Sequence, residues 1–93
     1  MQKLSEEEIQ RALGSLPAWT LQNGEIVLNR TFKNFVAAMA FVNDVAQLAE
    51  SAGHHPDIDI RYNRVRLALV THDAGGLTRK DIDLAHEINS LRG

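Results

Sequence analysis

The sequence predicts an α+β fold, with a four-stranded, mainly antiparallel sheet and helices packed on one face of it. Two stretches alternate apolar and polar residues around a short turn, as the strands of a hairpin do. Three other segments have the helical spacing of apolar residues, two of them with a capping signal at the start. The predicted order is αββαββα, and the 93 residues form a single domain, residues 1–93.

The first helix is expected over residues 6–13. Ser5 and Glu8 have the spacing of a capping box, in which each side chain accepts a hydrogen bond from the backbone of the other residue. Gly14 suits the left-handed position just after a helix, and Pro17 prevents the helix from continuing.

The first hairpin is predicted over Trp19–Phe32, with Asn23 and Gly24 as its two turn residues. A type I′ turn needs positive φ at both central positions, which Asn and Gly tolerate. This turn fixes the pairing of the strands and gathers the large apolar residues on one face. The expected pairs are Gln22 with Glu25, Leu21 with Ile26, and Trp19 with Leu28.

A long helix is predicted from Asn34 to about Ala52, with Gly53 in the left-handed position after it. Its apolar residues form a wide face suited to lying across a sheet. The two stripes of this face are Phe35, Met39, Val42, Ala46 and Ala49, and Ala38, Phe41, Val45, Leu48 and Ala52. Glu50 is a misfit in the last turn, where a carboxylate meets the negative end of the helix dipole.

The second hairpin is predicted from Asp57 to about Val70, turning at Asn63 and Arg64. The corresponding pairs share one apolar face: Tyr62 with Val65, Ile60 with Leu67, and Ile58 with Leu69. Continued outward, the same pairing sets His55 opposite His72. We therefore expect these two histidines to lie close together at the mouth of the hairpin.

The segment from Asp73 to Gly76 is expected to be a flexible loop before a third helix, which runs to about Leu91. Thr78 and Asp81 have the spacing of an N-cap residue and its N3 carboxylate, so this helix begins as the first one does. Its inward residues are expected to be Leu84, Ala85, Ile88 and Leu91.

Composition and charge exclude several functional classes. A net charge of −2, with Lys and Arg scattered along the chain, gives no electrostatic reason to expect nucleic-acid binding. The chain has no cysteine, and therefore neither a disulfide nor a thiolate metal site. Its apolar runs are too short to span a bilayer and its start lacks a signal-peptide core, so we expect no membrane association and a cytoplasmic location.

The stretch Glu50–Pro56 gives the first indication of chemistry. It holds His54 and His55 at the junction between the long helix and the second hairpin, and His72 is expected nearby. Imidazole titrates close to neutral pH, so converging histidines can provide both an acid and a base. These residues favour proton transfer on a small molecule, with no metal and no cofactor.

Each of these residues also has a purely structural explanation. Asp81 is a good N3 capping residue, Glu50 can be a surface residue one turn before His54, and Tyr62 suits a sheet or core position. His86, in the third helix, is interpreted as structural or solvent-exposed. A metal site is less favoured, because adjacent histidines in a loop do not readily bind one ion.

Seven residues at fixed spacing resemble the signature of the pterin-4a-carbinolamine dehydratases, also called 4a-hydroxytetrahydropterin dehydratases. They span 32 residues and are Glu50, His54, His55, Pro56, Tyr62, His72 and Asp81. The order of helices and strands extends the resemblance to nearly the whole chain. It implies a lyase that removes water from a 4a-hydroxytetrahydropterin to give the quinonoid dihydropterin, which recycles the cofactor of aromatic amino acid hydroxylases.

The resemblance also implies which residues form the site. His54, His55 and His72 would be catalytic, with His54 and His72 transferring protons and His55 chiefly binding and polarising the pterin. The substrate-binding residues would be Glu50, Pro56, Thr71, Asp73 and Asp81. Of these, Glu50 and Asp81 would orient imidazoles or contact the bound ring.

Members of this family need no metal and form homodimers or homotetramers, often by joining sheet edges, and a pterin is the expected small-molecule partner. Two alternatives stay open. Animal members also act as a dimerisation cofactor of a homeodomain transcription factor, so the chain can be a non-catalytic binding module of the same fold. It can also serve another pterin pathway, such as the one that leads to molybdenum cofactor.

Overall fold

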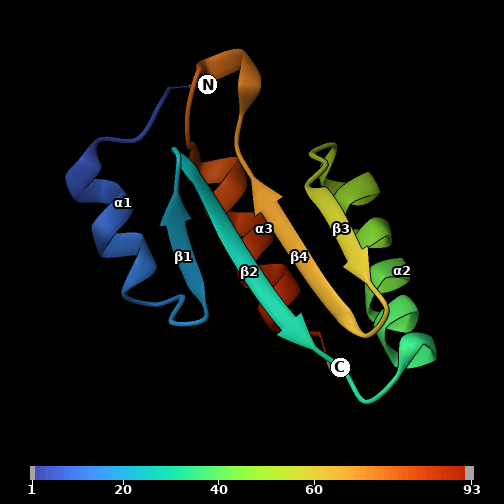
Figure 1. The fold of residues 1–93 in the computed structure, drawn as a ribbon. Helices are drawn as coiled ribbons and strands as arrows, with labels where there is room; N and C mark the ends of the chain where they lie inside the picture. Colours follow the sequence, from blue (N-terminus) through green and yellow to red (C-terminus); the bar gives the residue numbers. More distant parts are fainter. Residues whose placement is uncertain (1, 92–93) are drawn as a thin grey trace.

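The computed structural model describes residues 2–91 and has the predicted αββαββα order (Figure 1). Helices α2 and α3 lie behind a four-stranded sheet, and α1 flanks its β1 edge. The elements are α1 Glu6–Leu13, β1 Trp19–Gln22, β2 Glu25–Thr31, α2 Phe35–Ala52, β3 Asp57–Arg61, β4 Arg64–Leu69 and α3 Arg79–Asn89. A short 3₁₀ helix, η1 (His72–Ala74), precedes α3.

The sheet is antiparallel throughout and has the strand order β1-β2-β4-β3. The first hairpin has the predicted register, with Trp19 opposite Leu28. Its turn residues take the positive φ angles that a type I′ turn requires, 51° at Asn23 and 79° at Gly24. In the strand order given above, β2 and β4 are the central strands, and β1 and β3 are the edge strands.

The core lies between the sheet and the helices. Alternate residues of β4, namely Val65, Leu67 and Leu69, are buried on the side of the helices. Residues at helical spacing on α2 and α3 complete the cluster, among them Ala38, Phe41, Val45, Ile82, Ala85 and Ile88. No helix of residues 2–91 covers the opposite face of the sheet (Figure 1). None of the helices in this range is long and apolar enough to cross a bilayer.

Both predicted capping boxes are present, at Ser5 with Glu8 and at Thr78 with Asp81. In α1 the Ser5 hydroxyl accepts from the Glu8 N–H at 3.1 Å, and Glu8 Oε1 accepts from the Ser5 N–H at 2.8 Å. The second bond is the main reason that the pKa of the Glu8 carboxyl lies below its ordinary value. The expectation of a left-handed Gly14 is wrong, because its φ is −60°.

The second hairpin differs from the prediction by two residues. Its turn is at Tyr62 and Asn63, one residue earlier than expected, and Ile60 pairs with Val65 instead of with Leu67. A slip of two residues keeps the same side chains on the apolar face, because side chains alternate with a period of two. The apolar pattern therefore does not distinguish the two registers.

Asn63 fixes the observed register through Phe32, the residue after β2. The Asn63 carbonyl accepts from the Phe32 N–H at 2.8 Å, and the Asn63 amide donates to the Phe32 carbonyl at 2.7 Å. Tyr62 takes a φ of 53° in the turn and is 65% exposed, so the sheet or core position suggested for it is wrong.

The observed register also changes what lies opposite His55. Asp57 pairs with Ala68, so the same pairing continued outward sets Val70, and not His72, opposite His55. The register on which the expected closeness of the two histidines is based is therefore wrong, but the closeness itself is confirmed, because both line one hollow. Their approach depends instead on the chain that follows β4.

That segment is more ordered than expected. Residues 73–76 were predicted as a flexible loop, but η1 begins at His72 and an isolated bridge joins Thr71 to Gly76. Gly75, with a φ of 75°, ends η1 and donates its N–H to the His72 carbonyl at 3.0 Å. The backbone of His72 is thus held in a closed turn.

Helix α2 buries a narrower face than expected. Its buried residues are Ala38, Phe41, Val42, Val45 and Ala49. Phe35 is 48% exposed, and Ala46 and Ala52 are exposed as well, so the outer members of both predicted stripes face solvent.

Gly53 ends α2 with a φ of 63°, as predicted, and leads directly into His54. We predict that Gly53→Ala lowers the free energy of unfolding by about 1 kcal/mol, the strain of a Cβ in the left-handed region. Space is not the cause, since an added Cβ meets no atom within 4 Å. Gly53→Asn is the control and should cost less, because Asn tolerates this conformation. Urea denaturation measures both; unchanged stability of Gly53→Ala would contradict the prediction.

Candidate active site

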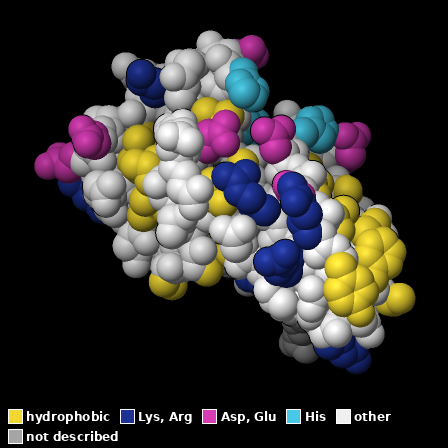
Figure 2. Space-filling view, in the orientation of Figure 1, with side chains coloured by type: hydrophobic (Ala, Val, Ile, Leu, Met, Phe, Trp, Pro, Cys, Tyr) yellow, Lys and Arg dark blue, Asp and Glu magenta, His cyan; other side chains and the backbone are white. Residues whose placement is uncertain are grey.

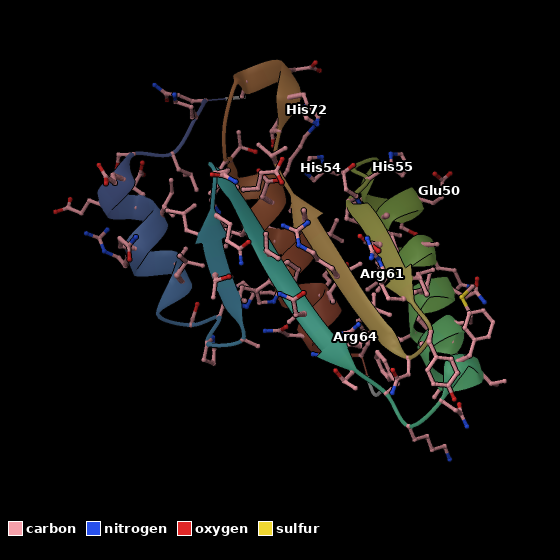
Figure 3. The ribbon with its side chains drawn as sticks, viewed as in Figure 1. Glu50, His54, His55, Arg61, Arg64 and His72 are labelled. Carbon is pink, nitrogen blue, oxygen red and sulfur yellow. The ribbon has the colours of Figure 1, made fainter. Side chains whose placement is uncertain are left out.

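Three histidines gather at one end of the sheet, where α2 ends and β4 leads into η1 (Figure 3). His54, His55 and His72 line a hollow of about 330 Å³. Its other lining residues are Gly53, Val70, Thr71, Asp73 and Lys80. Segments far apart in the sequence thus bring three imidazoles to one concave surface.

The end of α2 gives the two adjacent histidines different environments. After Gly53 the His54 N–H returns to donate to the Ala49 carbonyl at 3.1 Å. The His54 side chain is mostly buried, with 11% exposed, whereas the His55 side chain is 62% exposed. Two neighbours of the same residue type are therefore available for different tasks.

A buried carboxylate holds His54. Asp81 Oδ1 lies 2.6 Å from His54 Nε2, and the Asp81 side chain is completely buried. The other oxygen, Oδ2, accepts from the Thr71 hydroxyl at 2.8 Å and from the Thr78 backbone N–H at 2.9 Å. Three donors thus satisfy a charge that solvent does not reach, as burial of a carboxylate requires.

The two threonines extend this network. The Thr71 and Thr78 hydroxyls are 2.8 Å apart. Because Thr71 donates its hydrogen to Asp81, Thr78 is the donor to Thr71. The Thr78 hydroxyl accepts in turn from the Lys80 backbone N–H at 3.2 Å. The first turn of α3 and the residue next to η1 therefore hold the Asp81 carboxylate in one orientation.

The contact with Asp81 fixes which nitrogen of His54 carries hydrogen. A carboxylate only accepts, so His54 Nε2 is the donor and Nδ1 is left for a ligand. In the neutral ring Nδ1 is an acceptor and therefore a base. When Nδ1 takes a proton, the adjacent carboxylate stabilises the imidazolium that forms. The arrangement is suited to removing a proton from a bound molecule.

His55 is held by Glu50 in a more exposed setting. His55 Nε2 lies 2.6 Å from Glu50 Oε2, and the two side chains are 62% and 78% exposed. Glu50 is thus a surface residue, as one interpretation of the sequence suggested, but its contact is with His55 rather than with His54. Within residues 2–91 no three His, Cys, Asp or Glu side chains are arranged to hold a metal ion.

His72 is exposed at the start of η1 and lines the hollow from the side opposite α2. It also borders a second hollow of about 590 Å³, which lies beside the N-terminal segment and the turn of the first hairpin. The two hollows share Val70 and His72 as lining residues.

The other residues that the sequence singled out lie in different places relative to the hollow. Thr71 and Asp73 line the hollow, whereas Pro56 does not. Asp81 lies beneath the hollow, where His54 covers it. Tyr62 is in the hairpin turn, at the other end of β3 from the histidines.

Sequence reasoning missed Lys80 and the Thr78 hydroxyl. Lys80 lines the hollow from the first turn of α3, where the helix dipole disfavours a cation. This unfavourable position is a sequence signal that could have identified Lys80, because an unfavourable position at a helix end also drew attention to Glu50. The N-cap role of Thr78 follows from its spacing, but its contact with Thr71 depends on the tertiary fold.

Proteins of one family match the chain along its length. The family described as pterin 4 alpha carbinolamine dehydratase matches residues 2–91. A relative from Acidobacterium capsulatum is 66% identical over 91 residues, which are 98% of this chain and 99% of the relative. One from Chloroflexus aurantiacus is 62% identical over 93 residues, 100% of both chains. Both are provisionally named pterin-4-alpha-carbinolamine dehydratase.

Solved structures have the same fold. A transcriptional coactivator/pterin dehydratase from Brucella melitensis has a TM-score of 0.94 and 35% identity, and the match covers 99% of this chain and 100% of that one. A pterin dehydratase-like protein, a RuBisCO assembly factor in the alpha-carboxysome, has a TM-score of 0.63 and 19% identity. That match covers 77% of this chain and 83% of the other, and it shows the fold alone.

We predict that Thr71→Val destabilises the protein by about 2 kcal/mol. The change removes a donor to a buried carboxylate and leaves the Thr78 hydroxyl without its acceptor. Thr71→Ser keeps the hydroxyl and is the matched control. Guanidinium denaturation measures both variants. If the valine variant were as stable as the serine variant, the hydroxyl would not be needed to satisfy Asp81.

Proposed function

We propose that this chain, which belongs to the pterin 4 alpha carbinolamine dehydratase family, removes water from a 4a-hydroxytetrahydropterin and releases the quinonoid dihydropterin. The observation that carries the proposal is the convergence of three imidazoles on one hollow, one of them held by a completely buried carboxylate. In a cell with a tetrahydropterin-dependent aromatic amino acid hydroxylase, this reaction returns the spent cofactor to its cycle.

The reaction needs one base and one acid at the same bound ring. The base takes the proton from N5, and the electrons of the N5–H bond form the double bond between N5 and C4a. The C4a–O bond breaks, its electron pair leaves with the hydroxyl oxygen, and the acid protonates that oxygen to give water. Two imidazoles in opposite protonation states meet both needs near neutral pH.

We assign His54 as the base that accepts the N5 proton. Its Nδ1 is the ring nitrogen left free by the contact with Asp81, and the carboxylate 2.6 Å from Nε2 stabilises the positive charge that develops. Asp81 acts through His54 and is a positioning residue in this assignment. A substrate-binding role for Asp81 has no support from its position, because the side chain is completely buried.

We assign His72 as the acid. Its side chain is exposed, and it forms no ion pair with a carboxylate of residues 2–91. Its imidazolium can therefore pass a proton to the departing hydroxyl without breaking an ion pair. His55, oriented by Glu50, binds and polarises the ring in this scheme.

The other residues of the hollow are suited to binding the ring edge. Thr71 and Asp73 lie on one wall, next to His72, and Lys80 comes from the start of α3. Asp73 offers an acceptor for the amino and N–H groups of a pterin, and Lys80 offers a donor for its carbonyl oxygen. Pro56 lies outside the lining, so its role here is to restrict the backbone that carries His55.

A role as a binding module is the second candidate, and one observation favours it. The similar protein from Brucella melitensis is described both as a transcriptional coactivator and as a pterin dehydratase. A purely binding role makes no use of paired imidazoles. Catalytic activity therefore distinguishes the two candidates.

Assembly through a sheet edge also belongs to the proposal. The outer strands β1 and β3 each pair with one strand only among residues 2–91. An unpaired edge offers backbone donors and acceptors to another strand. Each edge also bears an apolar side chain that is 38% exposed, Leu21 on β1 and Ile58 on β3. A second copy of the chain would cover both features at once.

We predict that His54→Ala and His72→Ala each lower kcat by about 100-fold or more, the usual contribution of general acid–base catalysis. His55→Ala should raise KM with a smaller effect on kcat, because its role is binding. The rate is measured by following the loss of a 4a-hydroxytetrahydropterin that a phenylalanine hydroxylase generates in the same cuvette.

His86→Ala is the matched control, because His86 is an exposed histidine of α3 whose ring lies 3.4 Å from the Ser15 hydroxyl, away from the hollow. It should keep the parent rate. A His54 variant with full activity would overturn the assignment of the base. If the parent protein did not accelerate dehydration at all, the enzymatic proposal would fail and the binding module would be favoured.

We predict that light scattering shows a dimer or tetramer at micromolar protein concentration. Ile58→Lys and Leu21→Lys each place a charge on one edge strand, which is how natural sheets keep edges unpaired. Whichever variant becomes monomeric identifies the edge that assembles. A parent protein that is monomeric at this concentration would rule out the assembly.

A further inference from the structure

The open face of the sheet carries arginines that the proposed dehydration does not use. Arg64 and Arg66 on β4, and Arg61 on β3, lie on the side away from the helices, because the alternate residues of β4 face the core. Figure 2 shows Lys and Arg side chains gathered over the middle of this face. Figure 3 shows the histidines at one end of β3 and β4, and Arg61 and Arg64 towards the other end, where the hairpin turns.

Two adjacent cross-strand rows make up this cluster, which we call the arginine face. One row is Thr31, Arg64 and Arg61, and the next is Asn29, Arg66 and Asp59. All six residues border a hollow of about 510 Å³. The face therefore combines three guanidinium groups with a neutral amide, a hydroxyl and a single carboxylate.

The arginine face has an excess of positive charge. Its carboxylate, Asp59, is already engaged by Arg61, whose Nε donates to it at 3.1 Å. Arg64 and Arg66 form no ion pair with a carboxylate of residues 2–91. Two guanidinium groups therefore have their donors available for a ligand.

The pairing of the strands keeps like charges together on this face. Arg61 and Arg64 are directly opposite each other in β3 and β4. Like charges in directly opposite positions destabilise a sheet. Both residues are exposed, so burial in the core does not account for them. An anion placed between them converts this repulsion into attraction.

We propose that the arginine face binds a small molecule through its phosphate group. Guanidinium donates pairs of parallel hydrogen bonds whose geometry matches phosphate oxygens. The Asn29 amide and the Thr31 hydroxyl add neutral donors beside the guanidinium groups. A hollow of about 510 Å³ also has the size of a small-molecule site.

Acidic residues on the same face favour a small anion over a nucleic acid. Glu25 lies on the same side of β2 as Asn29, and Asp57 lies on the same side of β3 as Asp59. Both are towards the histidine end of the strands, where they would repel an extended phosphate chain. The ligand is therefore compact, with its phosphate at the turn end of the hairpin.

The arginine face is separate from the histidine hollow. Arg66, the arginine nearest to the histidine hollow along β4, precedes Val70, which lines that hollow, by four residues. In an extended chain this separation is about 13 Å, which is longer than a pterin ring. A pterin held by the histidines therefore does not supply the phosphate, and the two sites can be tested independently.

Titrations followed by ¹⁵N-HSQC spectra of the intact chain test the proposal, with inorganic phosphate and ribose 5-phosphate as the probes. Sodium chloride at matched ionic strength is the reference. We expect saturable shifts of backbone amides in residues 29–31 and 59–66, and none of this pattern with chloride. Absence of saturation, or the same shifts with chloride, would overturn the proposal.

The double variant Arg64→Gln/Arg66→Gln should bind ribose 5-phosphate about tenfold more weakly or worse, because it loses charge-assisted hydrogen bonds. Arg11→Gln and Arg79→Gln are the controls, since these arginines pair with Glu7 and Asp83 on the helices. They should bind as the parent does. Thermal unfolding checks that all variants are folded, and the dehydration rate should be unchanged by the double variant.

Two results would contradict the site as proposed. One is a double variant that binds the phosphate probes as tightly as the parent chain. The other is a single-stranded RNA oligonucleotide that binds this face more tightly than ribose 5-phosphate, which would assign the arginines to nucleic acid. Neither result bears on the dehydration of pterins, which is measured separately.

Discussion

A carboxylate that solvent does not reach must be satisfied entirely by the protein, and Asp81 is satisfied from three directions. The first turn of α3 supplies one donor, the segment after β4 supplies the Thr71 hydroxyl, and the exit from α2 supplies His54. The same contacts join three elements of the fold and orient an imidazole. Structure and chemistry at this end of the sheet therefore depend on one side chain.

The two imidazole–carboxylate pairs have the same distance and different surroundings. Both are 2.6 Å long, but the pair of His54 with Asp81 is mostly buried, whereas His55 and Glu50 are exposed. An exposed pair is screened by water and contributes little energy, while breaking a buried pair leaves a charge without compensation. The fold thus makes one histidine a fixed part of the protein and leaves its neighbour adjustable towards a ligand.

The limits of sequence reasoning are clear in the two hairpins. Asn23 and Gly24 specify their turn almost alone, because few residue pairs accept two positive φ angles. The second turn was misplaced, because a slip of two residues leaves the apolar face unchanged, and contacts of Asn63 with Phe32 decide the register. The histidines were visible from residue type and spacing. Lys80 was marked only by its unfavourable place at the start of α3, and the contact of Thr78 with Thr71 exists only in the folded chain.

Asp81 is buried and His72 is exposed, and this difference in burial affects what each residue indicates in a relative that binds other proteins. Asp81 completes the capping box of α3 and contacts three elements, so it stabilises the fold whether or not the chain is catalytic. The His72 ring is exposed at the rim, and stability makes little demand on it. In evolutionary terms, a relative that has left pterin chemistry is free to lose His72 first. The presence of Asp81 in such a relative therefore indicates only that the fold is retained.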